Sequence, residues 1–178
     1  MQKRWIIALA LAAMGGSFVA QAQTPTPADR AQTPAAQRST VDQEFITKAL
    51  EGGTKEVAMG KLAAQKATNA DVKAFANRMV TDHTKSVAEL AALTRMSAPS
   101  ADKMTPPAKL TEANGADFDR AYMAEMVAAH QATVALYERE VREGTDEALK
   151  KWANEKLTTV RDHLEKARAT QAKVGTTT

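Results

Sequence analysis

Residues 69–96 read NADVKAFANRMVTDHTKSVAELAALTRM, and the spacing of their apolar side chains decides the fold class. Apolar residues recur every three or four positions, at Val72, Phe75, Ala76, Met79, Val87 and Leu90. This is the period of an amphipathic helix that turns one face to a core. Asn69 stands where an N-cap is favoured, so we predict a helix from Asn69 to about Met96.

The same period recurs in three further segments. They run from Thr40 to about Ala67, from about Ala116 to Glu143, and from about Asp146 to Ala172. Short turns separate the first helix from the second and the third from the fourth, whereas residues 97–115 contain three prolines and form the one long connection. Two antiparallel helix hairpins joined by a long loop predict an all-α four-helix bundle of the ferritin-like kind over residues 40–172.

Local signals predict where these helices begin and end. Thr40 and Gln43 have the spacing of a capping box. Gly144 is expected to adopt a left-handed conformation after the third helix, and Thr145 to cap the fourth. Residues 173–178 are expected to form a short C-terminal tail.

The N-terminal part of the chain lies outside the helical pattern. Residues 1–22 combine two basic residues, an apolar stretch and a final AQA, which predicts a secretory signal peptide cleaved after Ala22. Residues 23–39 are rich in Thr, Pro, Ala and Gln and predict a flexible linker. Because the chain has no cysteine, it cannot carry a bacterial lipoprotein anchor, and we expect a periplasmic protein.

Composition excludes several classes of function. The absence of cysteine excludes disulfides, thiol nucleophiles, iron–sulfur clusters and cysteine zinc sites. The formal net charge of +3 falls close to zero when the basic residues of the signal peptide are removed, which argues against nucleic acid as a partner. Alternating Lys and Glu on the first, third and fourth helices predict solvent-facing surfaces.

The chain has three histidines, one on each of three helices. His83 and His130 fall on the apolar stripes, each four residues after a methionine, Met79 and Met126. His163 lies at the edge of its stripe, so we expect it to matter less than His83. A buried imidazole needs hydrogen-bond partners or a metal ion, so these residues are the candidates for chemistry.

Glu56 is the expected carboxylate partner. It lies about 12 residues from the first turn and His83 about 15, which gives similar heights at a rise of 1.5 Å per residue. Gly52, Gly53 and Gly60 flank Glu56 and allow a helix or ligand to come close. The spacing does not fix the register between the two hairpins.

Two hypotheses follow for Glu56, His83, His130 and His163. They can bind one zinc, manganese, iron or copper ion. Alternatively they form a buried hydrogen-bond cluster that fixes helix register.

The spacing of residues also bears on two other kinds of metal site, a di-iron site and a Cu(I) site. The six-ligand site of ferritin-like di-iron enzymes is not present, because valine stands where glutamate is required, three residues before each histidine. The pairs Met79/His83 and Met126/His130 have the i, i+4 spacing at which thioether and imidazole can share Cu(I). Methionine on an apolar stripe is more often core filling.

Several of these motifs together resemble an exported bacterial family, domain of unknown function 4142. The motifs are EGGTKEV at 51–57, GKLA at 60–63, VKAFA at 72–76, DHT at 82–84, FDRAY at 118–122 and HL at 163–164. The resemblance covers about Thr40 to Ala172 and implies a ferritin-like bundle outside the cytoplasm. It implies little about activity.

The functional expectation is an exported binding or stress-related bundle with no assigned catalytic residue and a possible metal ion at its centre. The alternatives are a metal-dependent oxidoreductase, a periplasmic copper-binding protein, and a module with an envelope protein partner. The oligomeric state stays open.

Overall fold

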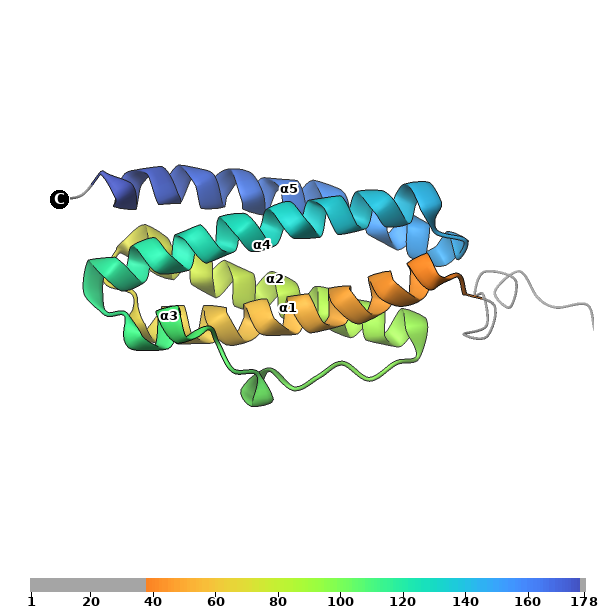
Figure 1. Cartoon of the computed structure of the whole chain (residues 1–178), viewed down its shortest axis with the longest axis horizontal. Coiled ribbons are helices and arrows are strands. Elements are labelled where there is room, and N and C mark those ends of the chain that lie inside the picture. The colour runs from red at the N-terminus through yellow and green to blue at the C-terminus, as the bar shows by residue number, and fades with distance from the viewer. Residues whose placement is uncertain (1–37, 177–178) are drawn as a thin grey trace, which may run out of the picture.

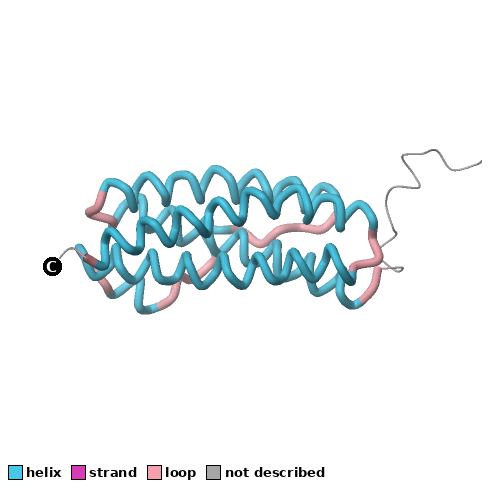
Figure 2. The backbone as a smooth tube through the Cα atoms, turned by 90° about the horizontal axis from the view of Figure 1, so that it is seen from above, coloured by secondary structure: helices cyan, strands magenta, loops and turns pink. Residues whose placement is uncertain are grey.

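A computed structural model describes residues 38–176, and this part of the chain is helical without strands. α1 (Thr40–Lys66) and α2 (Ala70–Thr94) form one antiparallel hairpin, and α4 (Gly115–Glu143) and α5 (Glu147–Gly175) form the other. The four helices lie side by side along one long axis (Figure 1), and the view from above shows the same arrangement (Figure 2). The predicted four-helix bundle of two hairpins is confirmed.

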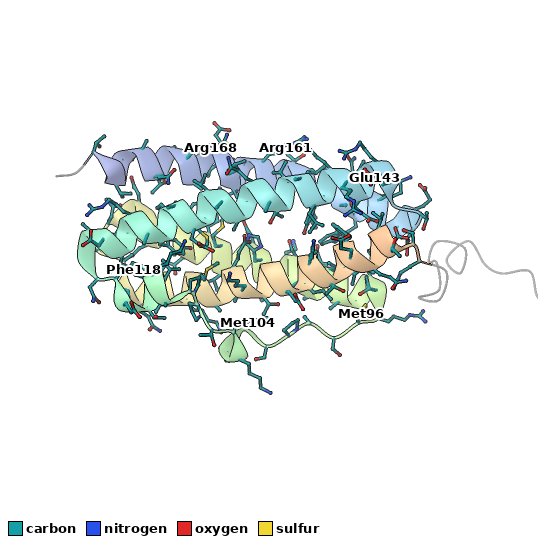
Figure 3. The ribbon with its side chains drawn as sticks, viewed as in Figure 1. Met96, Met104, Phe118, Glu143, Arg161 and Arg168 are labelled. Carbon is teal, nitrogen blue, oxygen red and sulfur yellow. The ribbon has the colours of Figure 1, made fainter. Side chains whose placement is uncertain are left out.

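The crossing segment, residues 95–114, returns along the outside of the bundle from the end of α2 to the start of α4 (Figure 1). Met96 is 44% exposed at its beginning, and Figure 3 places Met104 farther along it. This return gives every helix an antiparallel relation to the helices it packs against, as in ferritin-like bundles.

The crossing segment contains two short helices that the sequence pattern did not predict. They are η3 (Ala101–Lys103) and α3 (Ala108–Glu112). Leu110 is fully buried and attaches α3 to the core, and Lys66 donates to the carbonyl of Thr111 at 2.7 Å. One leucine in a five-residue helix gives too little periodicity to recognise.

The apolar core consists of two clusters, one toward each end of the bundle. One contains Met59, Phe75, Met79, Phe118, Tyr122, Met123, Met126, Ala167 and Val174, among others. The other contains Phe45, Ile46, Leu50, Leu90, Tyr137, Leu149, Trp152, Leu157 and Val160. On every long helix a polar residue falls between the stretches that supply the two clusters: Glu56, His83, His130 and His163. The bundle is therefore divided by a central polar layer.

The helix ends differ in detail from the predicted ones. The capping box of α1 is formed by Ser39 and Asp42 rather than by Thr40 and Gln43. Gly144 has φ −62° and ψ 154°, so it is extended and not left-handed, and Asp146 rather than Thr145 caps α5. Helix α5 also continues to Gly175, beyond the predicted start of the tail.

The expected signal peptide, 1–22, and nearly all of the expected linker lie outside the described residues. The last two linker residues belong to the bundle instead. Arg38 is buried and forms an ion pair with Asp146 at 3.1 Å, and Ser39 caps α1. Among residues 38–176, no helix combines the length and the apolar character that a membrane crossing requires.

Glycines let α1 approach α2 closely at two points. A Cβ at Gly53 would lie 2.7 Å from Cγ2 of Val87, and one at Gly60 would lie 3.1 Å from the backbone oxygen of Ala76. A Cβ at Gly52 would have no neighbour within 4 Å in the described part of the chain. Packing therefore explains two of these three glycines but not Gly52.

Gly52→Ala should stabilise the protein by about 0.5–1 kcal/mol, because alanine loses less conformational entropy in a helix and meets no obstacle here. Gly60→Ala should destabilise it, because the backbone of α2 cannot move aside for the new methyl group. Urea unfolding of both variants, followed by circular dichroism, measures the difference. Equal effects of the two substitutions would contradict the close contact at Gly60.

Candidate metal centre

Each long helix contributes one side chain to the central polar layer. The exposed fractions are 3% for Glu56, 7% for His83, 0% for His130 and 1% for His163. The sequence placed His163 at the edge of its stripe, but the structure buries it more completely than His83. Its imidazole also reaches across the bundle to Asp82 of α2.

The three imidazoles face one another at short range. Their ring centroids are 5.4–5.5 Å apart in all three pairs. One nitrogen from each of His83, His130 and His163 can be chosen so that all three atoms lie within 4.8 Å of one another. Glu56 adds a carboxylate, with Oε2 2.9 Å from His83 Nε2 and Oε1 3.7 Å from His130 Nδ1.

Two of the imidazoles are oriented by a hydrogen bond at one of their ring nitrogens. His130 Nδ1 lies 2.9 Å from the carbonyl oxygen of Met126, which can only accept, so Nδ1 carries the proton. His163 Nε2 lies 2.9 Å from Oδ2 of Asp82, a carboxylate that also accepts from Arg78. In both rings the other nitrogen is left with a free lone pair. Partners of this kind orient histidine ligands in metal sites.

Three buried ring nitrogens have no hydrogen-bond partner among the described residues. They are His83 Nε2, His130 Nε2 and His163 Nδ1, one from each ring. His83 Nε2 is close to Glu56, but the contact is not aligned as a hydrogen bond. A buried polar atom left unpaired costs about 1–3 kcal/mol. His83 Nε2 still has the carboxylate of Glu56 2.9 Å away, so the atoms that the hydrogen-bond cluster leaves without any partner in residues 38–176 are His130 Nε2 and His163 Nδ1.

The donor set fits a transition-metal ion. Imidazole nitrogens bind zinc, copper, iron and nickel, and a carboxylate is a common additional ligand. Nitrogens that share one tetrahedral ion at about 2.0–2.1 Å lie roughly 3.3 Å apart. Each of the three nitrogens therefore needs to move inward by at most about 1 Å to share one ion.

The electrostatics of the layer keep two imidazoles ready to act as ligands. Burial lowers the pKa of His130, and it lowers the pKa of His163 to about 4 despite the bond to Asp82. Burial works against charge on Glu56 and His83 too, but their mutual attraction lowers the pKa of Glu56 and raises that of His83. Only a deprotonated imidazole nitrogen can bind a metal ion.

Asp82 is a functional candidate that the sequence analysis missed. Both Asp82-His83 and Asp162-His163 are Asp-His pairs, and this repeat was the available signal. Asp82 binds the histidine of the other pair, His163, whereas Asp162 accepts from Arg78 at 2.6 Å. A single helix pattern does not reveal such a contact across helices.

Residues 27–170 match a family model described as "Domain of unknown function (DUF4142)", which is most of the chain. The chain belongs to the DUF4142 family. The family resemblance inferred from the motifs is thereby confirmed. No curated protein matches this DUF4142 chain.

Two solved structures share the fold of this DUF4142 protein. One is described as "CopM in the Ag-bound form (by co-crystallization)", with 18% identity and a TM-score of 0.60, covering 72% of this chain and 93% of that one. The other is "CopM in the Cu(II)-bound form", with 17% identity and a TM-score of 0.61, covering 74% and 96%. At this identity the likeness shows the helical bundle alone.

Proposed function

We propose that the protein is an exported, periplasmic metal-binding bundle that holds one transition-metal ion at its centre. His83, His130 and His163 are its proposed ligands, and Glu56 is the fourth. The observation that carries the proposal is the set of three buried ring nitrogens, one from each histidine, that accept or donate no hydrogen bond within residues 38–176. Export is supported by the signal-peptide pattern of residues 1–22.

Copper(II) is the ion that the donor set favours. The site offers imidazole and carboxylate but no thiolate, which suits the divalent first-row ions. Among these, Cu(II) binds a given nitrogen and oxygen site most tightly. Two bundles of the same fold are described as Cu(II)-bound and Ag-bound, which supports copper ahead of zinc, manganese or iron.

Metal titration tests the proposal. Mature protein purified from the periplasm without chelator, with Gln23 as its first residue, should bind one equivalent of Cu(II) by calorimetry and elemental analysis. His130→Ala and Glu56→Gln should each weaken binding by about tenfold or more, because the first removes a donor nitrogen and the second removes the negative charge of the carboxylate. Glu51→Gln is the matched control, since Glu51 is an exposed glutamate on the same helix.

The control should bind copper like the wild type. Wild-type protein that binds none of Cu(II), zinc, manganese and Fe(II) stoichiometrically would refute the metal site. It would leave the hydrogen-bond cluster as the role of these residues.

A further inference from the structure

A cavity of about 20 Å³ lies beside the proposed ligands. Glu56 and His83 line part of it, and the aromatic side chains of Tyr137 and Trp152 line another part. A water molecule needs about 10–15 Å³ of such space, so the cavity has room for one water molecule. The central layer is therefore not closed by side chains on the side of Glu56 and His83.

A groove of about 610 Å³ reaches Glu56 from outside, between α1 and α4. These helices form the face toward the viewer in Figure 1 and pack less extensively on each other than the helices within each hairpin. Residues that line both the groove and the cavity are Lys48, Gly52, Glu56, Thr133 and Leu136. These five residues, the shared wall, separate solvent from the cavity.

Gly52 is the smallest part of the shared wall. It is exposed, and no atom of residues 38–176 comes close enough to require a glycine there. Glycine in the middle of a helix costs about 1 kcal/mol relative to alanine. At Gly53 and Gly60 the close contact with α2 requires a glycine despite this cost, but Gly52 makes no such contact with α2. Because Gly52 has no side chain, the groove above Glu56 stays open.

We infer that the metal centre is open to a small exogenous ligand, which enters through the groove between α1 and α4 and past Gly52. An ion held by the three histidines and Glu56 keeps one exchangeable coordination position toward the cavity, for water or a small anion. Exchangeable positions of this kind distinguish reactive metal sites from purely structural ones. The inference rests on the proposed metal site and adds that the ion is accessible.

Azide is a suitable probe because it is a small anion that binds Cu(II). Adding azide to Cu(II)-loaded wild-type protein should change the electron paramagnetic resonance spectrum and produce a saturable azide-to-copper absorption band. Gly52→Leu, which places a side chain over the groove, should slow azide association by about tenfold or more. Copper stoichiometry should stay at one.

Gly175→Leu is the matched control. Gly175 is also a helical glycine whose Cβ would meet no atom within 4 Å among the described residues, and it does not line the groove. Its copper complex should bind azide at the wild-type rate. If Gly52→Leu does not fold, Thr133→Leu tests the same wall from the side of α4.

The outcomes separate the two proposals. Copper-loaded wild type that does not respond to azide has a closed centre, which overturns the inference and leaves the metal site intact. Unchanged azide rates in both Gly52→Leu and Thr133→Leu overturn the route. Failure of the wild type to bind copper refutes the metal site, and the inference falls with it.

Discussion

Replacing Glu140 by glutamine should raise the free energy of unfolding at pH 9 by on the order of 4 kcal/mol. Glu140 is fully buried, and no N–H or O–H group of residues 38–176 donates to its carboxyl oxygens. Burial, with the carboxylates of Asp42 and Asp146 nearby, raises the pKa of Glu140 from 4.5 to about 8. The fold accommodates this group easily only in its protonated form.

The sign of the pH dependence follows from the raised pKa. Between pH 4.5 and about 8 the folded protein keeps a proton on Glu140 that the unfolded chain releases. Stability from this group is therefore complete below pH 4.5 and is lost as the pH rises through 8. The glutamine variant has no such group, so its stability should lack this decline.

Urea unfolding at pH 5, 7 and 9 measures the effect. Glu143→Gln is the control, because Glu143 lies near the same end of α4 and is exposed (Figure 3). The control should keep the pH dependence of the wild type. If Glu140→Gln keeps it as well, Glu140 is ionised in the folded protein at neutral pH.

Glu140 also shows what a one-helix pattern cannot reveal. The alternation of Lys and Glu predicted a solvent-facing surface, and this prediction was wrong for Glu140. Its side chain folds back over Gly144, where a Cβ would lie 2.5 Å from Oε1, and reaches Asp42 and Asp146. These partners begin two other helices, and Asp42 is about a hundred residues away in the sequence.

The fold itself was predictable because its determinants are local. The spacing of apolar side chains fixes each helix, and the lengths of the connections fix the topology. Helix ends were predicted less well, because they depend on which of several adjacent polar residues finds a partner. Asp42, for example, accepts from Thr145 in the turn between α4 and α5, and this contact favours Ser39 over Thr40 as the cap of α1.

The central layer was predictable within each hairpin but not between them. Heights along α1 and α2 placed Glu56 beside His83, and the structure puts them in contact. The apolar stripe of α4 correctly predicted that His130 is buried. His163 is buried and contacts Asp82 of α2, a neighbour that the pattern of α5 alone could not indicate.

Copper(II) at a free concentration about 1,000 times its dissociation constant should raise the free energy of unfolding by about 4 kcal/mol. His163→Ala should abolish most of this rise, because the variant removes one of the three buried histidine nitrogens proposed as ligands. Edge placement in the sequence predicted a smaller role for His163 than for His83. Its burial and its bond to Asp82 now predict an equal one.

For Asp82→Asn, the rise in the free energy of unfolding caused by copper should be smaller than for the wild type and larger than for His163→Ala. The asparagine no longer supplies the charge that fixes the proton on His163 Nε2, and loss of such a partner lowers metal affinity by about 10–100-fold. Asp162→Asn is the matched control, since Asp162 belongs to the other Asp-His pair and hydrogen-bonds to Arg78 and Lys166 rather than to a histidine. The control should gain as much stability from copper as the wild type.

Urea unfolding of each variant, with copper and with chelator, measures the rise. The comparison is made within each variant, so any loss of packing caused by the substitution cancels. A hydrogen-bond cluster without metal predicts that copper and chelator give the same wild-type stability. A metal held elsewhere on the chain predicts an equal rise in wild type and His163→Ala. A metal at the central layer requires that the rise caused by copper be largest in the wild type, smaller in Asp82→Asn and smallest in His163→Ala.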